Sequence, residues 1–435
     1  MLKKVAIFLV IALILLASIS PAVASNLNSE GALVAVDEDN PVEVTITKQL
    51  RLPVGTTVPD ISFVFLAEKI SVDGRTTEAD LNTMPALNPA ALGVNFTAAD
   101  TNPNFPETIP VGTASILKET GNLFEGVTFP HAGIFVYEIR EVADSNAPAF
   151  PDEHSSLYYS QATYTLTVYV ANHSNGGTYV YAVGALITTD DLGEPASGKV
   201  DPTPGGNGED YFFSQMMFTN DYVKTEGPVD PEKPDPVDES TLLISKTVAG
   251  DFGDQSQFFT FEMTLTAPAL LRDVPAYYKA YVIEGDTVLT DLTAHAEAGI
   301  IENTGDVPYL KVSTSAATVF HLKHGQRLVF VDTPVGTNYS VEEQAATHYV
   351  PSVIVTTAGT VGTSITGSIS TALSTGPQFV GEEHNSAAFT NTRDSVTPTG
   401  LNLNDIPFIV MIILAAGALT ATAVIKVRKG KHHSH

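Results

Sequence analysis

The sequence predicts an all-β protein that contains two tandem immunoglobulin-like β-sandwich domains. Short runs of alternating apolar and polar residues recur along the chain, and they are rich in the Val, Thr, Tyr and Phe that favour strands. A Pro-rich, acidic stretch at 223–240 separates these runs into two groups, and the groups carry similar motifs in the same order. We therefore expect one β-sandwich domain at 40–222, a semi-rigid linker at 223–240 and a second β-sandwich domain at 241–394.

The chain has 435 residues and a formal net charge of −27. This length suffices for two or three domains that each bury a core. Because a phosphate backbone binds to basic surfaces, the acidic balance excludes nucleic acid as a partner and suits a soluble surface outside the cell. The chain contains no cysteine, so disulfides cannot stabilise it if it is secreted.

Both ends of the chain carry targeting segments. Two lysines, an apolar run and a small-residue Ala-Val-Ala site occupy 1–24, a pattern typical of a cleaved secretory signal peptide. An uncleaved membrane anchor is the alternative. Near the other end, 406–425 is apolar and long enough to span a bilayer, and a basic tail follows it directly. We expect the chain to be secreted and held transiently in the membrane by this tail.

Both groups contain several runs of alternating apolar and polar residues, the pattern expected of strands. In the first, ISFVFLA, FVYEIREV, ATYTLTVYV and TYVYAVGALI alternate strongly, and Asn175-Gly176-Gly177 between the last two is a hairpin signal. In the second, FFTFEMTL, RLVFVDT and NYSVEE alternate in the same way. No helical run of comparable strength accompanies them, so each group predicts a sandwich of short strands.

The two groups are similar to one another. The first opens with VTITKQL and closes with MMFTN, whereas the second opens with LLISKTVAG and closes with AAFTN. Between these ends, PHAGIFVYEIRE and PVGTNYSVEE share a Pro, a nearby Gly and then Tyr-x-Ile/Val-x-Glu. Three agreements in the same order indicate a divergent tandem repeat.

Polar residues occupy the apolar face of several predicted strands. In VEVTITKQL (42–50), Lys48 shares the parity of Val44 and Ile46. Later strands of the first half place a glutamate and an asparagine in the same way, and the second half repeats the pattern. Each half is thus predicted to direct one Lys, one Glu and one Asn inward: Lys48, Glu141 and Asn220, then Lys246, Glu343 and Asn391.

Such buried polar residues allow three interpretations. They could form a buried Lys–Glu ion pair whose leftover hydrogen bonds the asparagine satisfies. They could instead lie at strand ends and reach water by snorkelling. In the third interpretation, burial lowers the lysine pKa and raises the carboxyl pKa, so that a neutral amine attacks the asparagine carboxamide with the help of the carboxyl group. The product is a neutral amide between the first and last strands, and ammonia is released.

These motifs resemble the isopeptide-linkage domains of Gram-positive pilins, especially the streptococcal T-antigen-type major pilin. The resemblance covers both halves and the tail. It implies a Lys48–Asn220 bond assisted by Glu141 and a Lys246–Asn391 bond assisted by Glu343. The neighbouring carboxylates Glu138 and Glu342 have the opposite strand parity, and we rank them lower.

The tail carries a second resemblance. VTPTG (396–400) stands directly before the apolar segment and is similar to the variant sorting motifs of this pilin family, although Thr397 occupies the usual proline position. The resemblance implies that a sortase cleaves between Thr399 and Gly400 and leaves the class of sortase open. The alternative is an ordinary single-span anchor with a fortuitous Pro-Thr-Gly.

The two resemblances together imply that the protein is a structural pilus shaft subunit of a Gram-positive cell wall. Sortase would join it to neighbouring subunits as a covalent homopolymer and to peptidoglycan. Lys199, flanked by Gly and Pro, is our candidate for the acceptor amine, with Lys69, Lys118 and Lys224 as alternatives. The competing hypothesis is a wall-anchored adhesin, pilus base or minor pilin that uses these domains as a stalk, but no further recognition domain is left over after the two repeats.

We expect no multiple-turnover enzyme, no cofactor and no metal site. No phosphate loop, nucleophile elbow or calcium-loop motif occurs in the sequence. The histidines of HLKH (321–324) have opposite parity on a strand, and the HHSH ending lies on the cytoplasmic side of the predicted tail.

Overall fold

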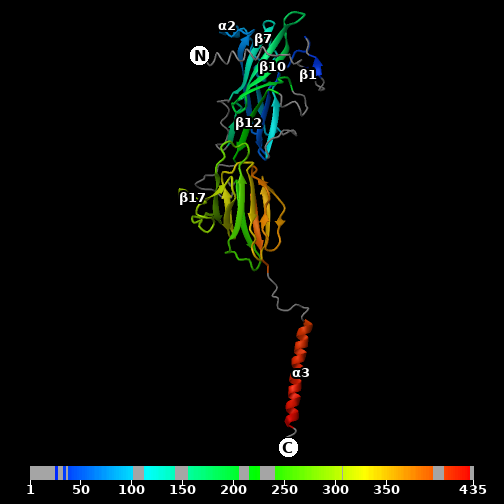
Figure 1. The fold of residues 1–435 in the computed structure, drawn as a ribbon, viewed down its shortest axis with the longest axis vertical. Coiled ribbons are helices and arrows are strands. Elements are labelled where there is room, and N and C mark those ends of the chain that lie inside the picture. The colour runs from blue at the N-terminus through cyan, green and yellow to red at the C-terminus, as the bar shows by residue number, and fades with distance from the viewer. Residues whose placement is uncertain are drawn as a thin grey trace.

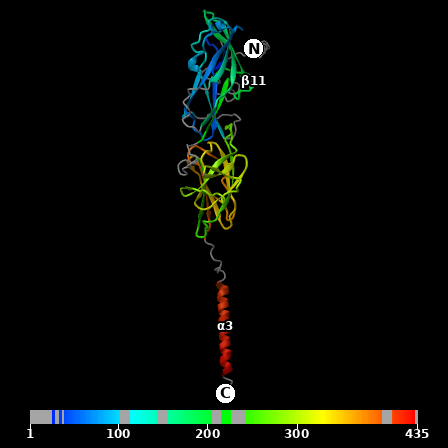
Figure 2. The same cartoon turned by 90° about the vertical axis from the view of Figure 1, so that its left-hand side faces the viewer.

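The computed structural model describes residues 25–27, 33–35, 38–100, 112–142, 155–204, 215–225, 241–305, 307–394 and 406–431. The predicted signal peptide, most of the predicted linker and the sorting motif with Thr399 and Gly400 lie outside these residues. The described chain is almost entirely β and forms two tandem domains that are stacked end to end (Figure 1 and Figure 2). The predicted all-β fold class is therefore confirmed.

Two facing sheets make up the described part of the first domain. The larger sheet has the strand order β11 (Pro195–Val200), β10 (Thr178–Thr189), β9 (Thr163–Asn172), β7 (Gly133–Val142), β4 (Ile61–Val72) and β5 (Gly93–Phe96). The smaller sheet has the order β6 (Thr113–Glu119), β3 (Thr47–Pro53), β12 (Met217–Lys224) and β8 (Ser155–Tyr158). The short strands β1 (Ser25–Leu27) and β2 (Leu33–Ala35) pair with one another, and the connections include α2 (Glu78–Leu81) and the 3₁₀ turn η1 (Pro89–Ala91).

Aromatic side chains fill the space between these two sheets. The rings of Phe65 on β4 and Phe218 on β12 are 5.0 Å apart, and the ring of Tyr164 on β9 is 5.1 Å from Phe218. The β9–β10 hairpin turns at Gly176 and Gly177, whose φ angles of +91° and +87° favour glycine. The hairpin signal in the sequence therefore predicts this turn correctly.

The second domain repeats the two-sheet plan among its described residues. One sheet has the order β17 (Ile301–Thr304), β18 (Val307–Ser313), β15 (Tyr277–Glu284), β20 (Gln326–Phe330), β13 (Leu242–Ala249), β27 (Ser386–Thr392), β22 (Val350–Thr357) and β23 (Thr360–Val361), with β16 (Thr287–Val288) on β15 and β24 (Ile365–Thr366) on β22. The facing sheet has the order β19 (Thr318–Leu322), β14 (Phe259–Thr266), β21 (Asn338–Glu343) and β25 (Leu373–Ser374), with β26 (Gln378–Phe379) on β21.

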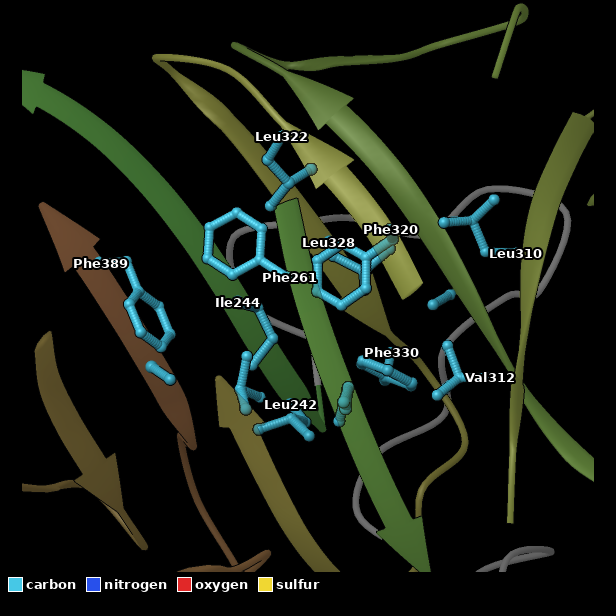
Figure 3. Close-up of a cluster of buried hydrophobic side chains, with 14 of the residues drawn as sticks. Leu242, Ile244, Phe261, Leu310, Val312, Phe320, Leu322, Leu328, Phe330 and Phe389 are labelled. Atoms are coloured by element: carbon cyan, nitrogen blue, oxygen red, sulfur yellow. The ribbon is translucent and has the colours of Figure 1, made fainter. Parts of the chain in front are cut away.

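The core of the second domain joins its two sheets in the same way. Figure 3 shows Phe261 from β14 and Phe389 from β27 directed toward one another beside Ile244 of β13. The Phe261 and Phe389 rings are 5.3 Å apart, and Phe320 stacks on Phe261 at the same distance. These side chains are at most 1 % exposed, so this part of the core is dry.

The opening and closing strands of each domain pair in parallel. In the first domain β3 pairs with β12, and in the second β13 pairs with β27. A parallel pair must be joined by a long connection, and here the connection is the rest of the domain. The first and last strands, which are far apart in sequence, therefore lie side by side.

Several contacts join the two domains at one junction. The main-chain N–H and the hydroxyl of Thr57 both donate to the Glu382 carboxylate, at 2.9 and 2.5 Å. Lys224 Nζ lies 3.4 Å from the same carboxylate, and the Lys224 carbonyl accepts the Val335 N–H at 2.8 Å. On another part of the junction, an Arg272 guanidinium nitrogen lies 3.6 Å from an Asp221 carboxylate oxygen.

A helix, α3 (Ile406–Lys431), ends the described chain. Among the residues whose side chains the structure describes, no helix combines the length and the apolar character needed to cross a membrane.

Candidate functional site

The candidate site of the first domain contains residues from both of its sheets. Lys48 comes from β3 and Asn220 from β12, which are parallel neighbours, and Glu141 comes from β7 on the facing sheet. Strand parity directs Lys48 and Asn220 to the same face, because Asn220 lies two residues beyond the partner of Lys48. All three residues are buried, with Lys48 and Asn220 at 0 % exposure. The structure thus brings together the three residues that parity selected in the first half.

Glu141 bridges the other two side chains. Each of its carboxylate oxygens lies 3.0 Å from Lys48 Nζ. Asn220 Nδ2 donates to Glu141 Oε1 at 2.9 Å, and Asn220 Oδ1 accepts the main-chain N–H of Ser160 at 2.7 Å. The amine and the carboxamide nitrogen therefore meet at one carboxyl group.

Burial controls the protonation of this site. It lowers the pKa of the Lys48 amine to about 8, against the opposing attraction of Glu141. Burial also raises the pKa of the Glu141 carboxyl, although Lys48 and its hydrogen bonds act in the other direction. Desolvation disfavours charge on both partners, so it favours a neutral amine beside a neutral carboxyl group.

The second site has the same construction. Lys246 on β13 and Asn391 on β27 are parallel neighbours with the same two-residue offset, and Glu343 comes from β21 on the facing sheet. Lys246 Nζ lies 2.6 Å from Glu343 Oε1, and Asn391 Nδ2 donates to the same oxygen at 2.5 Å. All three are at most 1 % exposed.

The same desolvation acts on the second site. Burial lowers the pKa of Lys246 to about 8 and raises the pKa of Glu343. The second site differs from the first in its hydrogen bonding. Two of its buried oxygens, Glu343 Oε2 and Asn391 Oδ1, have no hydrogen-bond partner among the described residues. Buried polar atoms usually form hydrogen bonds, so the second site contains two acceptors whose hydrogen-bonding capacity is not satisfied.

A phenylalanine ring covers each lysine amine, and sequence reasoning missed these residues. Lys48 Nζ lies 4.4 Å from the Phe63 ring centroid, and Lys246 Nζ lies 4.1 Å from that of Phe259. A second Phe, two residues along the strand, is paired in register with the site glutamate in both domains. The signal was present as Phe-x-Phe in ISFVFLA and FFTFEMTL.

The lower-ranked carboxylates lie outside these sites. Glu138 pairs across strands with Glu68 on β4, and Glu342 is exposed on β21. Of the histidines in HLKH, His321 lies on β19 and His324 accepts the Val248 N–H through Nδ1 at 2.9 Å. No group of three or more metal-ligating side chains occurs in the part of the chain that the structure describes.

The candidate acceptor lysines have different surroundings. Lys199 is exposed on β11, an edge strand of the larger sheet. Lys69 Nζ donates to the Met84 carbonyl at 2.5 Å, and Lys118 Nζ lies 2.6 Å from Asp100. Lys224 faces the domain junction. The Lys199 amine makes no hydrogen bond or ion pair with the described residues, which distinguishes it from the amines of the three alternatives.

This geometry can support chemistry between side chains of the same domain. A nucleophilic amine, a carboxyl group that can exchange protons and a carboxamide lie together in a dry interior. Two of them lie on strands that are already paired, so little motion separates the amine from the carboxamide.

Comparison with known proteins relates the chain to pilins. Residues 44–223 match the model of the Spy0128-like isopeptide containing domain, and residues 240–393 match a domain of unknown function (DUF7601). A pilin of Streptococcus pyogenes serotype M1 is 25% identical over 391 residues, which cover 87% of this chain and 89% of that protein.

Solved structures of streptococcal pilins are also similar. The major pilin from S. pyogenes matches with 18% identity over 82% of this chain and 100% of that one, with a TM-score of 0.29. The major pilin of S. pyogenes serotype GAS13637 matches with 18% identity over 81% of this chain and 98% of that one, with a TM-score of 0.28. Residues 44–223 of this chain are thus similar to the Spy0128-like isopeptide containing domain, and most of the chain is similar to a streptococcal pilin.

Proposed function

We propose that this protein is a pilus shaft subunit in which each domain is locked by an intramolecular Lys–Asn isopeptide bond. The observation that carries the proposal is the duplicated buried triad: in both domains one carboxyl group contacts a lysine amine and an asparagine nitrogen. The similarity of the chain to a streptococcal pilin supports the same assignment. The expected function is mechanical, and the reaction occurs once per domain rather than in repeated turnover.

The bond forms by condensation within the folded domain. The neutral amine of Lys48 adds to Asn220 Cγ, while Glu141 moves a proton from the attacking nitrogen to the departing one. Ammonia leaves, and the product is a neutral amide between β3 and β12. The product removes the buried amine, whose charged form would be costly to desolvate. Lys246, Glu343 and Asn391 perform the same step in the second domain.

Each crosslink is a covalent bond between the opening and closing strands of a domain, which a pulling force would otherwise separate. Opening and closing strands are parallel neighbours, so without the amide only hydrogen bonds and packing would hold them together. With the amide, tension that enters the last strand passes to the first through a bond. This property suits a fibre better than it suits a binding module.

Polymerisation requires a sortase, an acceptor amine and the predicted motif at 396–400. We infer that Thr399 is transferred to Lys199 of the next subunit, and to peptidoglycan at the base of the fibre. The exposure of Lys199 on an edge strand supports this choice, because an enzyme-bound thioester must approach the amine from solvent. The protein is then expected on the surface of a Gram-positive cell.

Two measurements test this proposal. The accurate mass of the folded region that spans both domains should be lower than the sequence mass by two ammonia molecules, and an unshifted mass would refute the crosslinks. Wall extracts of the producing cells should contain a ladder of species that react with antibody to this protein. A single wall-linked species without a ladder would support the stalk of an adhesin or a pilus base instead.

A further inference from the structure

The two sites differ in what holds the asparagine carbonyl oxygen. Asn220 Oδ1 accepts the main-chain N–H of Ser160 at 2.7 Å in a buried environment. Asn391 Oδ1 is also buried, but it has no hydrogen-bond partner among the described residues. The Asn220 carboxamide is therefore held at both ends, with its oxygen on Ser160 and its nitrogen on Glu141.

Ser160 is itself held in place by Asp191. Ser160 Oγ donates to Asp191 Oδ1 at 2.5 Å, and the same oxygen accepts the main-chain N–H of Thr219 at 2.9 Å. Thr219 directly precedes Asn220 on β12, and the Asp191 carbonyl accepts the Gln161 N–H at 3.1 Å. One aspartate thus ties the segment that carries the N–H donor to the strand that carries the carboxamide.

The turn that carries Asp191 fits closely against this segment. It joins β10 to β11, and Asp190 stabilises it by accepting the N–H groups of Leu192 and Glu194, each at 2.9 Å. Gly193 has a φ of +87°, and a Cβ at this position would lie 2.6 Å from Gln161 Oε1. A glycine therefore permits the close approach that brings Asp191 to Ser160.

We propose that the Ser160 main-chain N–H is an oxyanion donor for the condensation of Lys48 with Asn220, and that Asp191 is the residue that positions it. In the second domain no described residue supplies such a donor to Asn391 Oδ1. This inference rests on the proposed crosslinks and adds a residue outside the Lys–Glu–Asn triad.

The donor acts on the charge that develops during the reaction. As the Lys48 nitrogen bonds to Asn220 Cγ, the carbonyl electron pair moves onto Oδ1, where the Ser160 N–H stabilises it. The carbonyl then re-forms as the bond from Cγ to Nδ2 breaks. Nδ2 takes the Glu141 proton and leaves as ammonia, and Glu141 recovers a proton from the Lys48 nitrogen. One C–N bond forms, one breaks, and nothing is oxidised or reduced.

The two domains of one chain provide an internal control for the experiment. The full chain is translated in a cell-free system, samples are quenched in acid at increasing times, and the Lys48–Asn220 and Lys246–Asn391 peptides are quantified after digestion. Asp191→Ala should slow the first crosslink about tenfold or more relative to the second. Asp191→Asn keeps an acceptor oxygen and should restore most of the rate. Asp190→Asn keeps an acceptor oxygen for the Leu192 and Glu194 N–H groups and does not contact Ser160, so it should leave the ratio of the rates unchanged.

Other outcomes separate this inference from the proposed function. An unchanged ratio in Asp191→Ala, or an equal decrease in Asp190→Asn, would overturn the role of Asp191. If circular dichroism shows that Asp191→Ala does not fold, Ser160→Ala decides, because it keeps the N–H but removes the hydroxyl tether. That variant should slow the first crosslink several-fold, and a wild-type rate would contradict the inference. A wild-type chain that forms neither crosslink would contradict the proposed function itself.

Discussion

Lys48 and Asn220 lie on neighbouring parallel strands with an offset of two residues, because Phe218, not Asn220, is directly opposite Lys48. Both side chains therefore leave the same face of the sheet, one step apart along the strand direction. Asn391 has the same offset from Lys246 in the second domain. The same strand register occurs in both domains, and in both a carboxyl group from the facing sheet completes the site. This repeated arrangement identifies the site better than any single distance does.

Replacing the site glutamate should separate crosslinking from folding. In Glu141→Gln the side chain keeps its shape but cannot carry the proton, so the first domain should retain one ammonia in its mass. Without the bond, the closed loop of on the order of 170 residues is lost, and the free energy of unfolding should fall by about 5 kcal/mol through loop entropy. Mass spectrometry and thermal unfolding measure the two effects.

The matched control is Glu138→Gln, on the same strand but directed to the other face. It should keep the mass and the unfolding temperature of the wild type. A Glu141→Gln chain that still loses two ammonia molecules would show that the carboxyl group is dispensable.

Residue type and strand parity predict the triads, because alternation alone determines which face of a strand each side chain occupies. Parity selected Glu141 over Glu138 without knowledge of the sheet order. The phenylalanine over each lysine could also have been found, since Phe-x-Phe occurs in both halves. The Ser160 donor could not, because a main-chain N–H has no residue-type signature and its orientation depends on a distant turn.

Contacts between domains were also beyond sequence reasoning. Thr57 and Glu382 are 325 residues apart, and no periodic pattern connects them. The strand that carries Lys199 was missed for a different reason. PASGKV has low strand propensity, and its pairing with β10 supplies the stability that its sequence lacks.

The rate of crosslinking should rise with pH up to about 8, the value to which burial lowers the pKa of Lys48. At lower pH the Lys48 amine is protonated, and the ammonium cannot attack. Each pH unit below this midpoint should therefore reduce the rate about tenfold. Newly translated chain incubated at different pH values, with the linked peptides quantified over time, measures this profile. A rate that is constant from pH 6 to pH 9 would contradict a neutral amine nucleophile.

Removing the lysine should make stability depend on pH in a defined direction. In Lys48→Met, Glu141 keeps a pKa raised by burial and loses its cationic partner. A carboxyl group whose pKa is higher in the folded state stabilises that state below its unfolded pKa. This stability is lost as pH rises through the folded pKa, so the variant should unfold more easily at pH 7 than at pH 4.

The uncrosslinked reference for this comparison is Asn220→Ala, which keeps the buried Lys48–Glu141 pair. At pH 7 Lys48→Met should be about 3 kcal/mol less stable than Asn220→Ala, because removing one partner leaves a buried charge. Combining Lys48→Met with Glu141→Gln should recover most of this difference. Chemical denaturation at both pH values measures it, and a difference that does not change with pH would contradict the assigned shift.

The domain junction should loosen when Glu382 is removed. Glu382→Ala eliminates both hydrogen bonds from Thr57 and the ion pair with Lys224, while leaving the main-chain bond between Val335 and Lys224. Partly exposed charged contacts contribute about 0–1 kcal/mol each, so the unfolding temperature of either domain should change little. Small-angle scattering should instead detect a wider distribution of interdomain angles. Glu383→Ala is the neighbouring control, and equal loosening in both variants would remove Glu382 from this role.

Lys199→Arg should abolish polymerisation while both intramolecular crosslinks still form. Arginine keeps the positive charge, but its guanidinium stays protonated and cannot resolve a thioester as a lysine amine does. Lys118→Arg and Lys69→Arg are the controls, because those amines are already held by Asp100 and by the Met84 carbonyl. Immunoblots of wall extracts should show ladders for both controls and single subunits for Lys199→Arg, with two ammonia losses in every variant. A ladder that persists in Lys199→Arg and disappears in a control would transfer the acceptor to that lysine and leave the crosslinks unaffected.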